Sequence, residues 1–155
     1  MRDRRFVAEH RGGPLTRDQH RQLIAWAGDC ARSVLPLLGT DVDRRLLEAL
    51  QVARAWALGE ATVGAARKAA LQAFAVARAS ATPPAQAVAR SVGHAVATAH
   101  MADHALGAAL YALSAVRAAG GSSSAERRRQ DHQLPAGGRE LVLSARRQRE
   151  TASRR

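Results

Sequence analysis

Apolar residues recur at three- and four-residue spacing along most of the chain, which is the spacing of one face of an α-helix. The clearest case begins at Thr16, a typical N-cap residue that is followed by Gln19 at the capping-box position. From Leu23 to Val34 the apolar residues repeat, while the charged residues fall on the opposite side. This pattern predicts an amphipathic helix that ends near Pro36 or Gly39.

The same spacing predicts three more helices in the following 60 or so residues, by the usual start and stop signals. The second helix begins at Asp41 or Asp43 and ends at Gly59. The third extends from Thr62 to about Ser80. The fourth begins after Thr82, where two consecutive prolines break the chain and open the next helix.

The fourth helix lies in an alanine-rich segment that carries almost no charge. An unbroken helix from Pro83 to Ala119 would be long for a compact domain, so we expect a break near His100–Asp103 and a fifth helix from about Ala102. A row of small residues at four-residue spacing predicts that a neighbouring helix packs very close to the fourth one. The row consists of Ala85, Ala89, Gly93 and Ala97.

Towards the C-terminus the helices become shorter and more charged. Residues 120–124 form a loop, and Ser124 is the expected cap of a helix over Ala125–His132. Leu134 and Pro135 interrupt this helix, and Glu140–Arg149 form the last one.

The sequence therefore predicts an all-α protein, a compact bundle of about five to seven helices with a flexible basic C-terminal tail. Residues 1–14 form an N-terminal arm, residues 15–147 a single all-helical domain with a loop at 120–124, and residues 148–155 a disordered basic tail. A chain of 155 residues suits one domain with a real core.

Composition and charge indicate the cellular compartment and the kind of partner that this protein has. The net charge is +11, and the last 35 residues hold nine of the cations against four acids, so nearly half of the excess lies in this C-terminal segment, which points to a basic tail. The one cysteine, Cys30, excludes an intrachain disulfide framework and fits a reducing compartment. The first residues lack the apolar core of a signal peptide, and charged residues interrupt every apolar stretch. We expect a cytoplasmic protein with no membrane partner.

The candidate functional residues lie in the alanine-rich half of the chain. A buried polar side chain there must either have a hydrogen-bond partner or take part in function. The candidate cluster consists of His94, Thr98, His100, Asp103, His104 and Tyr111. We expect it to be a buried hydrogen-bond network that joins helices. In this network Asp103 holds one imidazole, and Thr98 or Tyr111 holds another.

A metal site is the alternative interpretation of the cluster. His100 and His104 are four residues apart and share a helical face if the helix continues, so with Asp103 they offer three zinc ligands. The residues after His100 lack the glutamate of a metalloprotease motif. Cys30 falls on the apolar face of its helix, where cysteine usually acts as a small hydrophobic residue. We therefore expect no catalytic residue and no cofactor.

Two arginine groups are candidates for contacts with partners. Arg67 and Arg78 flank Leu71 on the third helix and suit an acidic protein partner, although such arginines often only line a solvated rim. Weak, salt-dependent contact with nucleic acid is the other candidate role, through Arg127–Arg129 and the tail from Arg146 to Arg155; the alternative is that this tail is only solvated and frayed. No aromatic residues are interleaved with the arginines, so sequence-specific recognition is unsupported.

Several segments of the chain are similar to a known family. They are RRFVAEHRGGPLTRDQHRQLIAWAGDCA from Arg4, ARAWALGE from Ala53, ARKAA from Ala66, GHAVATAHMADHALGAALYAL from Gly93 and RELVLSARR from Arg139. They resemble small helical immunity proteins of bacterial polymorphic toxin systems, of the immunity-5-like type. The resemblance implies an all-α domain without enzyme activity, whose partner is a cognate toxin.

Three hypotheses about function follow. The first is a non-catalytic immunity protein that neutralises a toxin by occluding its surface. The second is a metal-binding protein or enzyme that uses His94, His100, Asp103 and His104. The third is a small basic protein that associates with nucleic acid through its tail.

Overall fold

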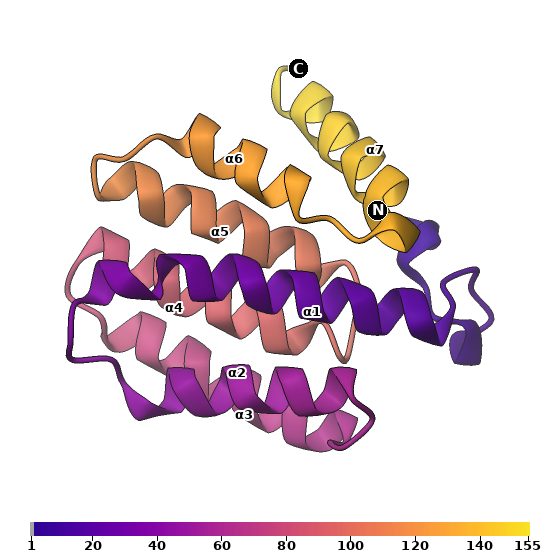
Figure 1. Ribbon diagram of the computed structural model, residues 1–155, viewed down its shortest axis with the longest axis horizontal. Coiled ribbons are helices and arrows are strands. Elements are labelled where there is room, and N and C mark those ends of the chain that lie inside the picture. The colour runs from indigo at the N-terminus through magenta and orange to yellow at the C-terminus, as the bar shows by residue number, and fades with distance from the viewer. Residues whose placement is uncertain (1) are drawn as a thin grey trace.

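The computed structural model describes residues 2–155 and places most of them in seven α-helices (Figure 1). The helices are α1 (Arg17–Val34), α2 (Arg44–Ala57), α3 (Val63–Ala79), α4 (Pro83–Ala97), α5 (His104–Ala118), α6 (Ser123–His132) and α7 (Ala136–Ser153). Short 3-10 turns η1 (Arg4–Phe6) and η2 (Glu9–Arg11) precede α1, and η3 (Leu35–Leu38) follows it. No β-strand occurs within residues 2–155, so the predicted all-α fold is confirmed.

The first four helices begin where the sequence predicts. Thr16, Thr62 and Thr82 each accept a hydrogen bond from the backbone N–H three residues later. Thr16 and Gln19 form a complete capping box. Asp43, and not Asp41, caps α2. A cap of this kind typically stabilises a helix by about 1 kcal/mol, so these local signals decide where the helices start.

Helix α4 is the central element of the bundle. It packs between α3 and α5, and α1 and α2 also contact it (Figure 1). Small side chains allow this close packing. The Ser91 hydroxyl donates to the backbone carbonyl of Ala108 at 2.7 Å. The ring of Phe74 lies so close to Gly93 that a Cβ atom there would come within 2.7 Å of it. The predicted row of small residues thus lies at a tightly packed helix surface.

A buried polar network joins α6 and α7 to the body. The Trp26 indole donates to the Gln130 carbonyl at 2.9 Å, and the Gln130 amide donates to the Ala109 carbonyl at 3.1 Å. Arg146 donates to the Gln130 side chain and, at 2.6 Å, to Asp131. Its guanidinium also lies over the Trp26 ring, 5.4 Å from the centroid. Each buried polar group of Gln130 therefore has a partner, which is what burial requires.

The predicted start of α6 is wrong by two residues. Ser122, and not Ser124, accepts the capping hydrogen bond, so the helix begins at Ser123. Ser122, Ser123 and Ser124 are all good cap residues, so residue type alone does not distinguish them.

The predicted start of α7 is also wrong, because the helix begins at Ala136 rather than Glu140 and includes two glycines. A Cβ atom on Gly137 would lie 2.5 Å from the Gln22 side chain, and one on Gly138 would lie 3.1 Å from Leu23. The glycines therefore allow α7 to approach α1 closely, which outweighs their poor helix propensity.

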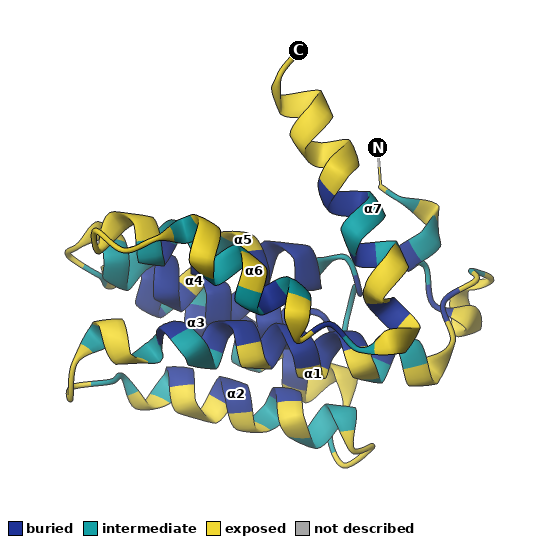
Figure 2. Cartoon of the chain, turned by 45° about the horizontal axis from the view of Figure 1, so that its top comes forward, coloured by how far each residue is buried: buried dark blue, intermediate teal, exposed yellow. Residues whose placement is uncertain are grey.

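The C-terminal residues continue α7 as far as Ser153, past the predicted end at Arg149. They are exposed and project from the body (Figure 2). Glu150 pairs with Arg127 of α6. Residues 148–153 are therefore helical in the structure, where the sequence predicted a disordered tail.

The N-terminal arm packs against the body through Phe6, which is 2% exposed. Arg5 donates to Ser144 at 2.8 Å and to Gln148 at 3.2 Å, so the arm also contacts α7. None of the helices formed by residues 2–155 has the length and apolarity needed to cross a membrane.

Candidate functional site

The histidine-rich segment forms the turn between α4 and α5. The helix breaks as predicted, because α4 ends at Ala97 and α5 begins at His104. The break lets the chain reverse, so that His94 at the end of α4 faces the start of α5. His100 and His104 therefore do not share one helical face.

His94 and His104 form the centre of the site. Their Nδ1 atoms are 2.9 Å apart, so one ring donates a hydrogen bond and the other accepts it. The Tyr111 ring stacks on His94 at 5.2 Å, and the Phe74 ring meets His94 edge-on at 5.2 Å. Gly107 makes room for this pair, since a Cβ atom there would lie 2.7 Å from His94 Nδ1.

Burial keeps these imidazoles neutral. It lowers the pKa of His94 to about 4, and the neighbouring His104 adds to the effect. Burial likewise lowers the pKa of His104. A single proton between the two Nδ1 atoms satisfies both rings, whereas full protonation of the pair would place two donors face to face.

Asp103 does not hold an imidazole, which corrects the expected hydrogen bond. Its carboxylate accepts a bond from Arg2 at 3.2 Å instead. The Thr98 hydroxyl donates to the backbone carbonyl of His94 at 3.0 Å and not to a ring. Thr98 is fully buried, but Asp103 and the histidines are only partly buried. The Asp103 carboxylate therefore pairs with Arg2 and forms no hydrogen bond with either ring of the histidine pair.

His100 lies apart from the pair. Its Nδ1 is enclosed and has no hydrogen-bond partner within residues 2–155. Burial lowers the pKa of His100, and the nearby Arg67 and Arg11 lower it further. No group of three histidine, cysteine or acidic side chains among residues 2–155 is arranged to hold a metal ion. The proposed ligand set of His100, Asp103 and His104 therefore does not converge.

Cys30 has the environment expected of a core residue. It is completely buried, and burial raises the pKa of its thiol to about 12. The thiol is thus protonated at neutral pH and contributes packing volume.

The predicted partner-binding arginines lie on the outer surface of α3. Arg67 and Arg78 are exposed, and Leu71 between them is 69% exposed. Val63, at the same helical spacing, is 39% exposed. Neither arginine forms an ion pair with a carboxylate of residues 2–155. We call this strip, made of Val63, Arg67, Leu71 and Arg78, the α3 outer face.

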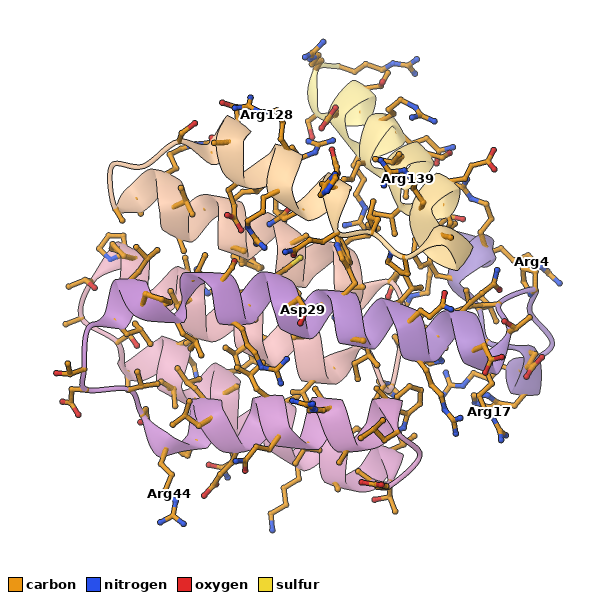
Figure 3. The ribbon with its side chains drawn as sticks, in the orientation of Figure 1. Arg4, Arg17, Asp29, Arg44, Arg128 and Arg139 are labelled. Atoms are coloured by element: carbon orange, nitrogen blue, oxygen red, sulfur yellow. The ribbon has the colours of Figure 1, made fainter. Side chains whose placement is uncertain are left out.

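Positive charge dominates the sequence around the α3 outer face. Residues 61–125 contain five lysine and arginine residues but one acid, Asp103, which is already paired with Arg2. One of the cations, Arg90, lies over the Tyr111 ring at 5.8 Å. Labelled arginines such as Arg17, Arg44 and Arg128 extend outward around the rest of the molecule (Figure 3).

Sequence reasoning missed two groups of polar residues. His20 is 4% exposed, and its Nε2 lies 2.6 Å from the carbonyl of Thr98. It lies one helical turn before Leu23 on the apolar face of α1, and this position was a usable signal. Gln130 and Arg146, which anchor the C-terminal helices, occupy core positions that their polar character concealed.

These features define the chain as a small all-α protein with an exposed basic helix face and no assembled metal cluster within residues 2–155. The chain belongs to the Imm-5 like putative immunity protein family, whose model matches residues 13–137. No curated protein and no solved structure matches it. Family membership supports an immunity-type role and implies a protein partner. The match ends as α7 begins, so it includes the histidine pair and the α3 outer face.

Proposed function

We propose that this protein is a non-catalytic, cytoplasmic immunity protein that neutralises a cognate toxin by covering part of the toxin surface. The α3 outer face is the contact surface in this proposal. The observation that carries it is Leu71, which is 69% exposed between two arginines that lack an acidic partner within residues 2–155. An apolar anchor with flanking arginines is a typical composition for the energetic centre of a protein interface.

Charge indicates what the partner surface looks like. The cations of residues 61–125 favour an acidic surface on the toxin, and they would speed association by electrostatic steering. A basic immunity protein does not mimic nucleic acid, so the proposal disfavours the nucleic-acid-binding groove of a nuclease toxin as the blocked surface.

The test is co-expression with each candidate toxin encoded beside the gene, followed by titration of the purified pair. Rescue of growth and a 1:1 complex are expected. Replacing Leu71 with Ser together with Arg67→Glu should weaken binding by about 30-fold or more, as for loss of an interface hot spot. Arg128→Glu is the matched control, because Arg128 is exposed on α6 (Figure 3) and changes the charge equally.

The results distinguish an error in the proposed contact surface from an error in the proposed immunity function. Tight binding that tolerates the α3 changes would refute the α3 outer face but retain the immunity role. Absence of binding and of rescue for every neighbouring toxin would refute the role. Retention on DNA that disappears when residues 148–155 are removed would instead favour the nucleic-acid hypothesis.

A further inference from the structure

A cavity of about 380 Å³ opens between the N-terminal segment, the start of α1 and the end of α2. It is separate from the α3 outer face and from the histidine pair. The residues that give it chemical character are His10, Arg17, His20, Arg21 and Trp56.

His20 supplies an unused hydrogen-bond acceptor in this cavity. Its Nε2 is 2.6 Å from the Thr98 carbonyl, and since a carbonyl only accepts, Nε2 carries the proton. Nδ1 then holds a lone pair, and no group within residues 2–155 donates to it. His20 is 4% exposed, yet Nδ1 is not among the fully enclosed atoms without partners. Nδ1 is therefore not fully enclosed, and His20 is one of the residues that line the cavity.

The surroundings of His20 favour the neutral ring, in which Nδ1 is a hydrogen-bond acceptor. The Trp56 ring lies 4.6 Å from the imidazole ring and covers one side of it. Burial lowers the pKa of His20 and outweighs the hydrogen bond to the Thr98 carbonyl, which raises it; a smaller electrostatic contribution from His10 also lowers it. The ring therefore stays neutral near pH 7 and accepts a hydrogen bond at Nδ1.

Two arginines supply positive charge to the cavity. The Arg21 guanidinium lies beside Gly59 in the cavity wall, where an added Cβ atom would come within 3.0 Å of it. Neither Arg17 nor Arg21 pairs with a carboxylate of residues 2–155. The one acid in the lining, Glu9, accepts a bond from the backbone N–H of Arg17.

We propose that this cavity binds a small oxyanion that carries a hydroxyl group, of which hydrogenphosphate is the simplest. Arg17 and Arg21 would hold the negative oxygens, and the hydroxyl would donate to Nδ1 of His20. A fully deprotonated oxyanion such as sulfate lacks this donor and leaves the acceptor unpaired. This site goes beyond the proposed immunity function and does not depend on it.

The experiment uses the full chain and follows the two tryptophan indole N–H signals by NMR at pH 7. Trp56 lines the cavity, whereas Trp26 lies in the Gln130 network and serves as an internal reference. Inorganic phosphate should shift the Trp56 signal to saturation and leave Trp26 unchanged. Sulfate at the same ionic strength should bind about tenfold or more weakly, because a buried acceptor left unpaired typically costs more than 1 kcal/mol.

Variants test the assigned roles. Arg21→Gln should weaken phosphate binding by about tenfold, since a charge-assisted hydrogen bond is lost. Arg54→Gln, an equal charge change at an exposed residue outside the cavity, should leave it unchanged. His20→Gln keeps a donor for Thr98 and replaces the Nδ1 acceptor with Oε1 at a different position, so the preference for phosphate over sulfate should shrink.

The proposal is overturned by equal phosphate and sulfate affinity in the unmodified protein, or by shifts that grow linearly without saturation. It is also overturned if Arg21→Gln and Arg54→Gln behave alike. If His20→Gln does not fold, the phosphate–sulfate comparison and the Arg21→Gln variant still decide the outcome.

Discussion

Replacing Gly107 with alanine tests whether the histidine pair depends on the space that this glycine leaves. In a helix interior, glycine to alanine normally stabilises by about 1 kcal/mol, because alanine has the higher helix propensity. At Gly107, however, the new Cβ atom would lie 2.7 Å from Nδ1 and 2.9 Å from Cγ of His94. These ring atoms cannot move without breaking the Nδ1–Nδ1 hydrogen bond to His104 or the stacking on Tyr111.

The magnitude follows from these opposing effects. Overpacking a tight site typically costs about 1–3 kcal/mol, and losing the hydrogen bond costs about 1 kcal/mol more. After the propensity gain is subtracted, Gly107→Ala should lower the free energy of unfolding by about 1–3 kcal/mol. The matched control is Gly28→Ala in the interior of α1, where the added Cβ atom meets only the flexible end of Arg32 at 3.4 Å. That variant should gain up to about 1 kcal/mol.

Urea denaturation followed by far-ultraviolet circular dichroism measures both variants. The transition midpoints should move in opposite directions at an unchanged slope. If Gly107→Ala proves as stable as Gly28→Ala, the histidine pair is not tightly packed against α5, and the reasoning above is refuted.

Four further predictions concern pH, the C-terminal helices and metal. The pKa of His94 is about 4 in the folded protein and near 6.5 in the unfolded chain, so the free energy of unfolding should be largest above pH 6.5 and fall as the pH drops towards 4. The lowered pKa values of His20 and His104 act in the same direction. A smaller fall in the variant His94→Gln identifies the contribution of this ring. Arg146→Ala should cost about 2–4 kcal/mol in urea denaturation because it leaves Gln130 and Asp131 without their donor, whereas exposed Arg147→Ala should change stability by less than about 0.5 kcal/mol. Removing Gln148–Arg155 should cost less than about 1 kcal/mol, since its contacts are exposed, and a large fall in melting temperature would contradict this. A chelator should leave the melting temperature unchanged, and a fall that added zinc reverses would restore the metal-site alternative.

Local signals explain what the sequence predicted correctly. The caps at Thr16, Thr62 and Thr82 each depend on residues within one helical turn, whereas the break between α4 and α5 was predicted from the length limit of a compact domain. Side-chain hydrogen bonds to nearby backbone atoms decide such caps almost independently of the rest of the fold.

Long-range packing explains what the sequence could not predict. Asp103 pairs with Arg2, which is 101 residues away in the chain, and not with the imidazole next to it. The glycines that open α7 are tolerated because α1 lies against them, a contact that their own sequence does not encode. The pairing of His94 with His104 required the exact reversal of the chain at the turn, whereas periodicity alone placed His100 beside His104.

Helices α4 and α3 differ in how freely their residues can be substituted. On α4, a larger side chain at Gly93 would collide with Phe74, so this position has almost no freedom to change. On the α3 outer face, Arg67, Leu71 and Arg78 have no hydrogen bonds that the core requires. Substitutions at these exposed residues therefore cost the fold little and can alter the surface offered to a partner, whereas a larger residue at Gly93 of the central helix would disrupt its packing.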